Sequence, residues 1–201
     1  MNAKTYLIEL FPKTISYKLA KRGLLKPANP ITLTFSVTAA CQSLCKTCQI
    51  GKLYRDNPKR AREDLTLEEI EMIFKSMGHI YFFNISGGEP FLRKDLPQIV
   101  ELACKYLRPG IVHIPTNALL PKRIEELTIE ILDIMREHAP KALLTIKPSI
   151  DGIGEKHDEI RGIKGNFKRL EETICRLKKL QKENLFFHVE LGTVVSNYNI
   201  N

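Results

Sequence analysis

Three cysteines stand close together in the run Cys-Gln-Ser-Leu-Cys-Lys-Thr-Cys, which begins at Cys41. Thiolates are the usual ligands of iron–sulfur clusters, and a cubane cluster normally takes four of them. Three thiolates on one loop would leave one iron open to bind and reduce a small molecule. We therefore expect Cys41, Cys45 and Cys48 to bind one [4Fe–4S] cluster. Structural zinc usually takes four Cys or His ligands in two pairs, and no second pair follows, so zinc and a disulfide are the weaker alternatives.

The other two cysteines, Cys104 and Cys175, lie in helix-like patterns far along the chain. They would make poor fourth ligands, and we expect both to be buried helix residues. Five cysteines with no signal-peptide pattern favour a reducing compartment, and we expect a cytoplasmic protein. The longest apolar runs are much shorter than a membrane span requires.

Two further segments could contact a ligand. The run Ser86-Gly87-Gly88-Glu89-Pro90 follows the cysteines by roughly 40 residues. Its glycines would let the backbone approach a ligand closely, and Glu89 could accept a charge-assisted hydrogen bond from an ammonium group. The alternative is an ordinary turn after a strand. Later in the chain, Ser149 is followed by Arg161, whose planar guanidinium suits a carboxylate. An ordinary surface ion pair is the alternative for this arginine.

These motifs together resemble the radical S-adenosylmethionine (SAM) superfamily, nearest to its SPASM and twitch-related members, and they extend from Thr34 to about Asn197. The resemblance implies a [4Fe–4S] cluster whose open iron chelates the amino and carboxylate groups of SAM. It implies reductive cleavage of SAM to a 5′-deoxyadenosyl radical that abstracts hydrogen from a substrate which the sequence does not identify. An electron donor such as flavodoxin or ferredoxin would be required. The SAM contacts that it implies are Gly87, Gly88, Glu89, Asn117, Ser149 and Arg161.

Some positions depart from the family pattern or have a second interpretation. Thr47 stands where many members have an aromatic residue, so Ile50 or Tyr54 would have to supply apolar cover for adenine. Ala118 replaces the glycine of the family's Thr-Asn-Gly turn. Two further residues, Asp151 and Asn197, could reach the same cavity, although a structural role is the better interpretation of each. His188 is a candidate substrate contact or an ordinary core histidine.

Strand-like and helix-like patterns alternate from residue 31 onward, which predicts an α/β fold with parallel strands. Thr66 and Glu69 form a capping-box pattern, while Asp95 and Asn166 are candidate helix caps. The resemblance implies a partial (β/α) TIM-like barrel with about five of six β/α units present. Expected strands are 31–38, 79–86, 111–116, 142–150 and 185–195, and expected helices begin near residues 66, 95, 121 and 166.

We expect residues 1–29 to be a basic extension with a helical middle and residues 30–201 to be a core barrel truncated after the fifth strand. A missing sixth strand would mean a shortened chain, a naturally shorter protein or completion by a second polypeptide. Without it, the apolar strand 185–195 would expose an unpaired edge and promote self-association.

The chain has 43% hydrophobic and 27% charged residues, as in an ordinary globular protein, and a formal net charge of +8. Residues 1–29 carry six of the Lys and Arg residues against the single acid Glu9. Such a segment could meet an acidic partner, a lipid surface or nucleic acid, or be merely solvated. Besides the radical SAM enzyme, two functions therefore stay open: a catalytically incompetent iron–sulfur or SAM-binding fragment or partner subunit, and a nucleic-acid-binding module.

Overall fold

A parallel five-stranded sheet forms the centre of the computed structural model, which describes residues 3–200 except the side chains of residues 3–6, 9 and 60–62. The strands lie in the order of the sequence, so each neighbours the next along the chain. This arrangement confirms the predicted α/β class. The strands are β1 (Thr32–Ser36), β2 (Phe82–Ser86), β3 (Ile111–Thr116), β4 (Leu143–Pro148) and β5 (Phe187–Val189).

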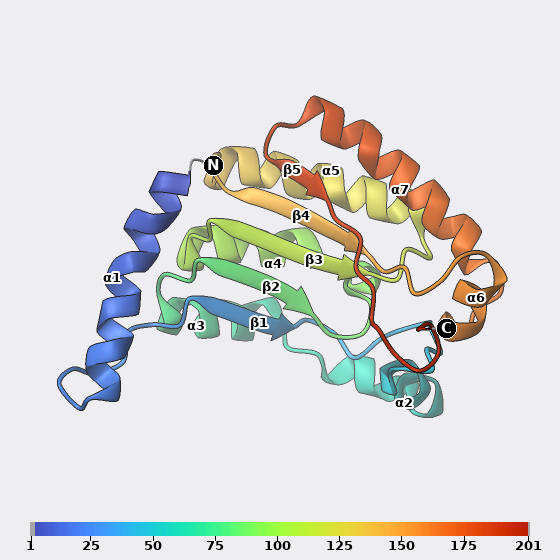
Figure 1. The fold of residues 1–201 in the computed structure, drawn as a ribbon, viewed down its shortest axis with the longest axis horizontal. Helices are drawn as coiled ribbons and strands as arrows, with labels where there is room; N and C mark the ends of the chain where they lie inside the picture. Colours follow the sequence, from blue (N-terminus) through green and yellow to red (C-terminus); the bar gives the residue numbers. More distant parts are fainter. Residues whose placement is uncertain (1–2, 201) are drawn as a thin grey trace.

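Four helices lie on one side of the sheet and connect successive strands (Figure 1). They are α3 (Leu67–Met77), α4 (Leu96–Leu102), α5 (Pro121–His138) and α7 (Asn166–Glu183). Shorter elements fill the loops at the carboxyl ends of the strands or extend these helices. They are α2 (Ile50–Asp56), η1 (Pro58–Glu63), η2 (Pro90–Leu92), the π-helical turn η3 (Ala103–Leu107) and α6 (Glu155–Arg161).

The core lies between the sheet and these four helices. Residues in register across a parallel sheet point to the same face, and one such row is entirely apolar: Leu33, Phe83, Val112, Leu144 and Phe187. Burying each such side chain contributes roughly 1.5–3 kcal/mol. The opposite face carries a polar row of Thr34, Asn84, His113, Thr145 and His188.

The predicted helix starts have different outcomes. The capping box of Thr66 and Glu69 is confirmed, with both reciprocal hydrogen bonds present. Asp95 is the N-cap residue of α4, but its carboxylate pairs with Arg93 and caps no backbone N–H. The prediction that Asn166 caps α7 is wrong, since Gly165 holds that position.

The orphan N–H groups at the start of α7 are satisfied from another helix. Gly165 and Phe167 donate backbone hydrogen bonds to the Asp158 carboxylate, which α6 supplies. A cap from another helix, seven to nine residues earlier in the chain, lies outside the local capping pattern, which is why Asn166 was the better candidate from the sequence.

The fifth strand is much shorter than the predicted 185–195. It contains only Phe187–Val189, followed by an isolated bridge between Gly192 and Ser149. Leu185 and Val195 are 85% and 77% exposed, so the apolar pattern there does not reflect burial in a sheet. In the described residues β5 pairs only with β4 and forms one edge of the sheet, and self-association through it stays a prediction.

Helix α1 (Ala3–Lys21) stands apart from the layers, beside the amino ends of the strands (Figure 1). Lys13 donates to the His79 carbonyl and Tyr17 to the Asn29 carbonyl, so one side of α1 is attached to the strand bases. The side chains of Lys4 and Glu9, part of the predicted basic extension, lie outside the described residues. Among the described helices, none combines the length and apolar character that crossing a membrane would need.

Candidate active site

The three motif cysteines lie on the loop that leaves the carboxyl end of β1, and their side chains line one cavity of about 180 Å³. The carboxyl ends of β2, β3 and β4 supply much of the remaining wall, as expected for an α/β sheet, and α2 and α6 add Ile50 and Arg161. All but one of the predicted SAM contacts line this cavity, and the exception is Glu89. The lining residues that the sequence predicted are Cys41, Cys45, Cys48, Gly87, Gly88, Asn117, Ser149 and Arg161.

The cysteine loop is held by backbone contacts with α6. Leu44 N–H donates to the Arg161 carbonyl (3.1 Å) and Lys46 N–H to the Ile160 carbonyl (2.8 Å). Next to this contact, Gly162 has a φ of +69°, and an added Cβ there would lie 2.4 Å from the Leu44 carbonyl oxygen. The close approach of two backbones therefore fixes where the cysteines lie.

The three thiols face a shared space but do not converge on one point. In the part of the chain that the structure describes, no group of three Cys, His, Asp or Glu residues is arranged to hold a single metal ion. In a cubane each cysteine binds a different iron, so three separated thiols around one cavity fit a cluster. Burial raises the pKa of the Cys41 thiol, so ligation there must displace a proton.

Gly87 and Gly88 approach the chain's own backbone, and their expected approach to a ligand stays a prediction. Gly88 N–H donates to the Thr38 carbonyl (2.8 Å), and Glu89 N–H donates to the Ala40 carbonyl (2.7 Å). A Cβ at Gly88 would lie only 2.1 Å from the Ala40 carbonyl oxygen. Gly87 has a φ of +121°, which residues with a Cβ rarely adopt. The two glycines thus fasten the end of β2 to the stem of the cysteine loop.

Glu89 is fully buried behind the cavity wall. Its carboxylate accepts hydrogen bonds from the Thr116 hydroxyl (2.9 Å) and from the backbone N–H groups of Asn117 (2.6 Å) and Phe91 (3.2 Å). Burial raises the pKa of Glu89 to about 7, against the opposing effect of these bonds. In this geometry Glu89 orients the turn after β3, and its contact with the SAM ammonium stays a prediction.

Glu89→Gln is expected to lower the free energy of unfolding by about 2 kcal/mol, because the amide nitrogen would face one of these donors. The native carboxyl has a raised pKa, so its contribution to stability is full below the ordinary pKa of 4.5 and falls as pH rises to about 7. The deficit of the variant should therefore be larger near pH 5 than near pH 8, as measured by urea unfolding. The control is Glu126→Gln, an exposed position on α5. Equal deficits at both pH values would contradict the raised pKa.

Asn117 and Ser149 reach the cavity from β3 and β4. The Asn117 amide lies 3.9 Å from the Cys41 sulfur and donates to the Gln42 side chain (3.3 Å). Ala118, which replaces the expected glycine, is buried and has a positive φ, a left-handed conformation that glycine adopts at lower cost. The left-handed backbone at this turn therefore explains why the family has glycine at this position. In this chain the same conformation is adopted by alanine.

Arg161 is not the surface residue of the alternative interpretation. Its side chain is 12% exposed and its Nε lies 2.9 Å from the Asp151 carboxylate, which is 1% exposed. Its Nη1 lies 3.4 Å from the Cys45 sulfur. A cation beside a thiolate ligand would offset part of the negative charge of a bound cluster. Asp151 therefore reaches the site through Arg161.

The other residues that the sequence singled out have mixed outcomes. Ile50 lines the cavity with the cysteines, whereas Tyr54 lines a neighbouring one and Asn197 is exposed. Cys104 is buried as predicted, and burial raises its pKa to about 12. The prediction that Cys175 is buried is wrong, because it lies on the exposed side of α7.

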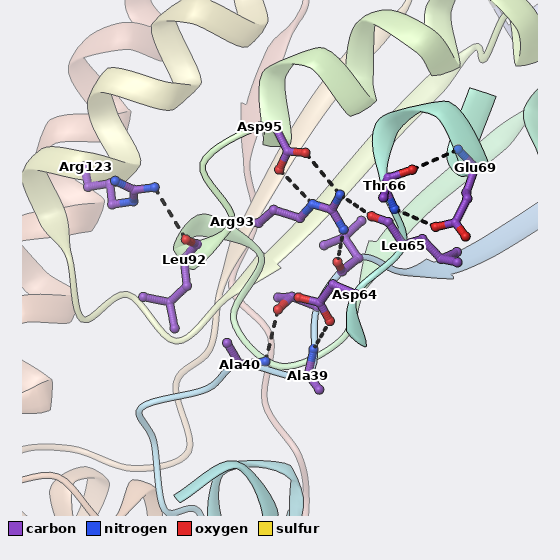
Figure 2. A network of polar contacts seen from close by, with 12 residues as sticks. Ala39, Ala40, Asp64, Leu65, Thr66, Glu69, Leu92, Arg93, Asp95 and Arg123 are labelled. Carbon is purple, nitrogen blue, oxygen red and sulfur yellow. Dashed lines mark hydrogen bonds and ion pairs between the residues drawn. The ribbon is translucent and has the colours of Figure 1, made fainter. Parts of the chain in front are cut away.

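Sequence reasoning missed Arg93, which is 8% exposed and supports the stem of the cysteine loop (Figure 2). It donates to the Val37 carbonyl (2.5 Å) after β1, to the Leu65 carbonyl (2.6 Å) before α3, and to both oxygens of Asp95. Figure 2 also shows the Asp64 carboxylate accepting from Ala39 N–H on the same stem (3.1 Å). Arg93 comes soon after Pro90 in the chain, and nothing in that spacing marks its partners.

The radical SAM superfamily model matches residues 35–197. Among curated proteins, the sporulation killing factor maturation protein SkfB of Bacillus subtilis (strain 168) is 29% identical over 165 residues, covering 81% of this chain and 36% of SkfB. The GTP 3′,8-cyclase of Aquifex aeolicus (strain VF5) is 30% identical over 167 residues, covering 81% of this chain and 47% of the cyclase. The mycofactocin maturase MftC of Mycolicibacterium smegmatis is 26% identical over 174 residues, covering 85% of this chain and 39% of MftC.

Among solved structures, a polyhistidine-tagged anSMEcpe with bound AdoMet has a TM-score of 0.57 at 21% identity, covering 83% of this chain and 42% of that one. Native anSMEcpe with bound AdoMet and Cp18Cys peptide has a TM-score of 0.55 at 18% identity, covering 86% of this chain and 55% of that one. These two show the shared fold, a partial TIM-like barrel.

The chain spans between about a third and a half of the length of the curated relatives it matches, at 36%, 47% and 39%. The matched region contains the cysteine loop, the Gly-Gly-Glu-Pro segment and Arg161, which the fold brings to one cavity. Members of the matched superfamily are enzymes that use a [4Fe–4S] cluster and SAM. By its motifs, its fold and this match, the chain belongs to the radical SAM superfamily.

Proposed function

We propose that this chain is the core of a radical SAM enzyme in which Cys41, Cys45 and Cys48 hold a [4Fe–4S] cluster. When bound, the cluster supplies the electron that cleaves the sulfonium C–S bond of SAM, giving methionine and a 5′-deoxyadenosyl radical that abstracts hydrogen from the substrate. One observation carries this proposal: residues from four separate motifs line a single cavity at the carboxyl ends of the strands.

The chain's own residues position SAM and keep water away. Arg161 offers its guanidinium to the SAM carboxylate, and Ser149 faces the same cavity from β4. Asn117 contributes an amide beside Cys41. Glu89 fixes the turn that presents Asn117, and Ile50 supplies apolar cover that excludes water from the reacting atoms.

The proposed function predicts that the anaerobically reconstituted chain forms 5′-deoxyadenosine and methionine in equal amounts when it is given SAM and dithionite. Liquid chromatography with mass spectrometry would measure both products. Cys45→Ala should form neither, while Cys175→Ala, with an exposed thiol outside the site, should match the wild type. A chain that holds a cluster and SAM but yields no 5′-deoxyadenosine would favour the alternative of a catalytically incompetent fragment or partner subunit.

We infer a peptide substrate. SkfB and MftC are both named as maturation proteins, and one anSMEcpe structure contains a peptide. The polar face of the sheet borders a second cavity of about 370 Å³, lined by His113, Lys147 and Glu190 among others, with room for a side chain or a short peptide segment. His188 is exposed and in register with Thr145 on this face, consistent with a substrate contact. The match to a GTP 3′,8-cyclase makes a nucleotide the second candidate.

We also infer a division of the chain into an N-terminal extension, residues 1–29, and a core of residues 30–201. The attachment of α1 beside the strand bases and the family match beginning at residue 35 support this boundary. The core would accept electrons from a donor such as flavodoxin or ferredoxin. Most of the formal net charge of +8 lies in residues 1–29, so the extension is the part that favours an acidic partner. Free cysteines in the described residues support a reducing, cytoplasmic location.

A further inference from the structure

Asp151 lies just beyond β4, and its carboxylate forms an ion pair on one side and accepts a hydrogen bond on the other. Its side chain is 1% exposed, and its Oδ2 lies 2.9 Å from Arg161 Nε. Its Oδ1 accepts a hydrogen bond of 2.9 Å from the backbone N–H of Val194. Its own N–H donates to Nδ1 of the buried His157 (3.2 Å), and burial lowers the pKa of that imidazole, which favours the neutral form that can accept. The carboxylate is thus fixed from both sides and from its backbone.

Val194 belongs to the segment that follows β5, residues 190–199, which we call the strap. In Figure 1 this segment crosses the carboxyl ends of the strands and reaches the region of α2 and the cysteine loop. Gly192 pairs with Ile150 through backbone N–H donation from Ile150 (2.8 Å). The Asn199 amide donates to the Asp151 carbonyl (3.2 Å) and the Val194 carbonyl (2.8 Å).

The far end of the strap also meets the cysteine loop. Lys46 Nζ lies 5.3 Å from the centroid of the Tyr198 ring. This separation is within the range of a cation–π interaction. Lys46 stands directly after Cys45 in the chain. The strap therefore touches the site at two places, through Asp151 and through the loop itself.

Arg161 is the link between Asp151 and the cavity. Because Asp151 occupies its Nε, the terminal nitrogens are the part that faces the cysteines, with Nη1 3.4 Å from Cys45 Sγ. A guanidinium fixed at Nε loses little freedom when its outer end binds a carboxylate. Removing one partner of such a buried pair leaves the other charge uncompensated.

We propose that Asp151 is a positioning residue that joins the strap to Arg161, so that order in the strap and binding of the SAM carboxylate are coupled. This inference rests on the proposed function, in which Arg161 receives that carboxylate. Coupling between two sites is reciprocal. Asp151 therefore holds Arg161 for SAM, and SAM bound at Arg161 in turn steadies the strap through Asp151.

The first test is Asp151→Asn, which keeps the shape and removes the charge. We expect an unchanged cluster content and about a 10- to 100-fold weaker SAM affinity, measured from the SAM-dependent change in the EPR signal of the reduced cluster. In cluster-free protein, amide exchange in the strap should become faster, as followed by hydrogen–deuterium exchange. Asp133→Asn, which removes a charge from an exposed ion pair on α5, is the matched control and should change neither measurement.

A second variant guards against loss of folding in Asp151→Asn. Asn199→Ala removes the strap's side-chain bonds to Asp151 and Val194 from a site outside the core. It should speed strap exchange and weaken SAM binding several-fold, with cluster content unchanged. In the wild type, added SAM should slow exchange across residues 190–199.

The coupling would be overturned if both variants bound SAM with wild-type affinity. It would also be overturned if added SAM left the amide exchange rate of the strap unchanged in the wild type. A reconstituted wild-type chain with a full cluster and no SAM-dependent EPR change would instead overturn the proposed function and the SAM part of this inference. These two failures are distinguishable, because failure of the coupling is judged in experiments in which the wild type does bind SAM.

Discussion

Cys45→Ala is expected to abolish stable cluster binding while leaving the fold in place. Two thiolates on the loop cannot hold three irons of a cubane, and alanine supplies no ligand. Cys45 is only partly buried, so its removal leaves no large cavity in the core. Iron and acid-labile sulfide analysis after anaerobic reconstitution should give about four of each per wild-type chain and near zero for the variant.

The matched control for this loss is Cys175→Ala, which removes a thiol of the same kind from the exposed side of α7. Its iron and sulfide content should equal that of the wild type. Stoichiometric zinc with no iron uptake in the wild type would refute the cluster assignment, as would an iron-replete Cys45→Ala chain.

Gly88→Ala is expected to damage both the stability of the chain and the cysteine loop, although it adds only one methyl group. The new Cβ would lie 2.1 Å from the Ala40 carbonyl oxygen and 3.0 Å from the Cys41 Cβ, and backbone cannot move aside as a flexible side chain can. The strain should cost about 3 kcal/mol of unfolding free energy and should displace Cys41. We therefore expect lower cluster occupancy together with weaker SAM binding, not a selective loss of SAM.

Gly192→Ala provides the comparison, because the three atoms nearest to its Cβ would all belong to the flexible Lys147 side chain, the closest at 3.0 Å. Urea unfolding and iron content should stay close to wild type there. A Gly88→Ala chain with wild-type stability and full cluster content would show that the end of β2 does not constrain the cysteine loop.

Patterns local in the chain were readable from the sequence. Three such patterns depend on neighbours within a few residues: the alternating strand from residue 31, the capping box at Thr66 and the cysteine spacing. The strand and the capping box are present as predicted, and the three cysteines line one cavity. The regular order of strands and helices also determined the parallel α/β fold, since successive parallel strands need crossover connections.

Elements whose form depends on distant partners were predicted less well. The fifth strand was expected over 185–195, but β5 contains only Phe187–Val189, because strand formation requires a partner and β4 pairs with it over this short stretch alone. The cap of α7 comes from Asp158 of another helix rather than from Asn166. An apolar or polar pattern alone does not reveal where such partners lie.

The sequence by itself determined which residues could do the chemistry: three thiols on one loop, a Gly-Gly-Glu-Pro turn, and a serine followed by an arginine in the next segment. Only the tertiary structure decided how they are held. Arg161 meets Cys45 from far along the chain, Asp151 forms an ion pair with Arg161, and Glu89 supports the wall from behind. Sequence spacing reports contacts along one element, whereas these contacts exist because parallel strands bring their carboxyl ends to one edge of the sheet.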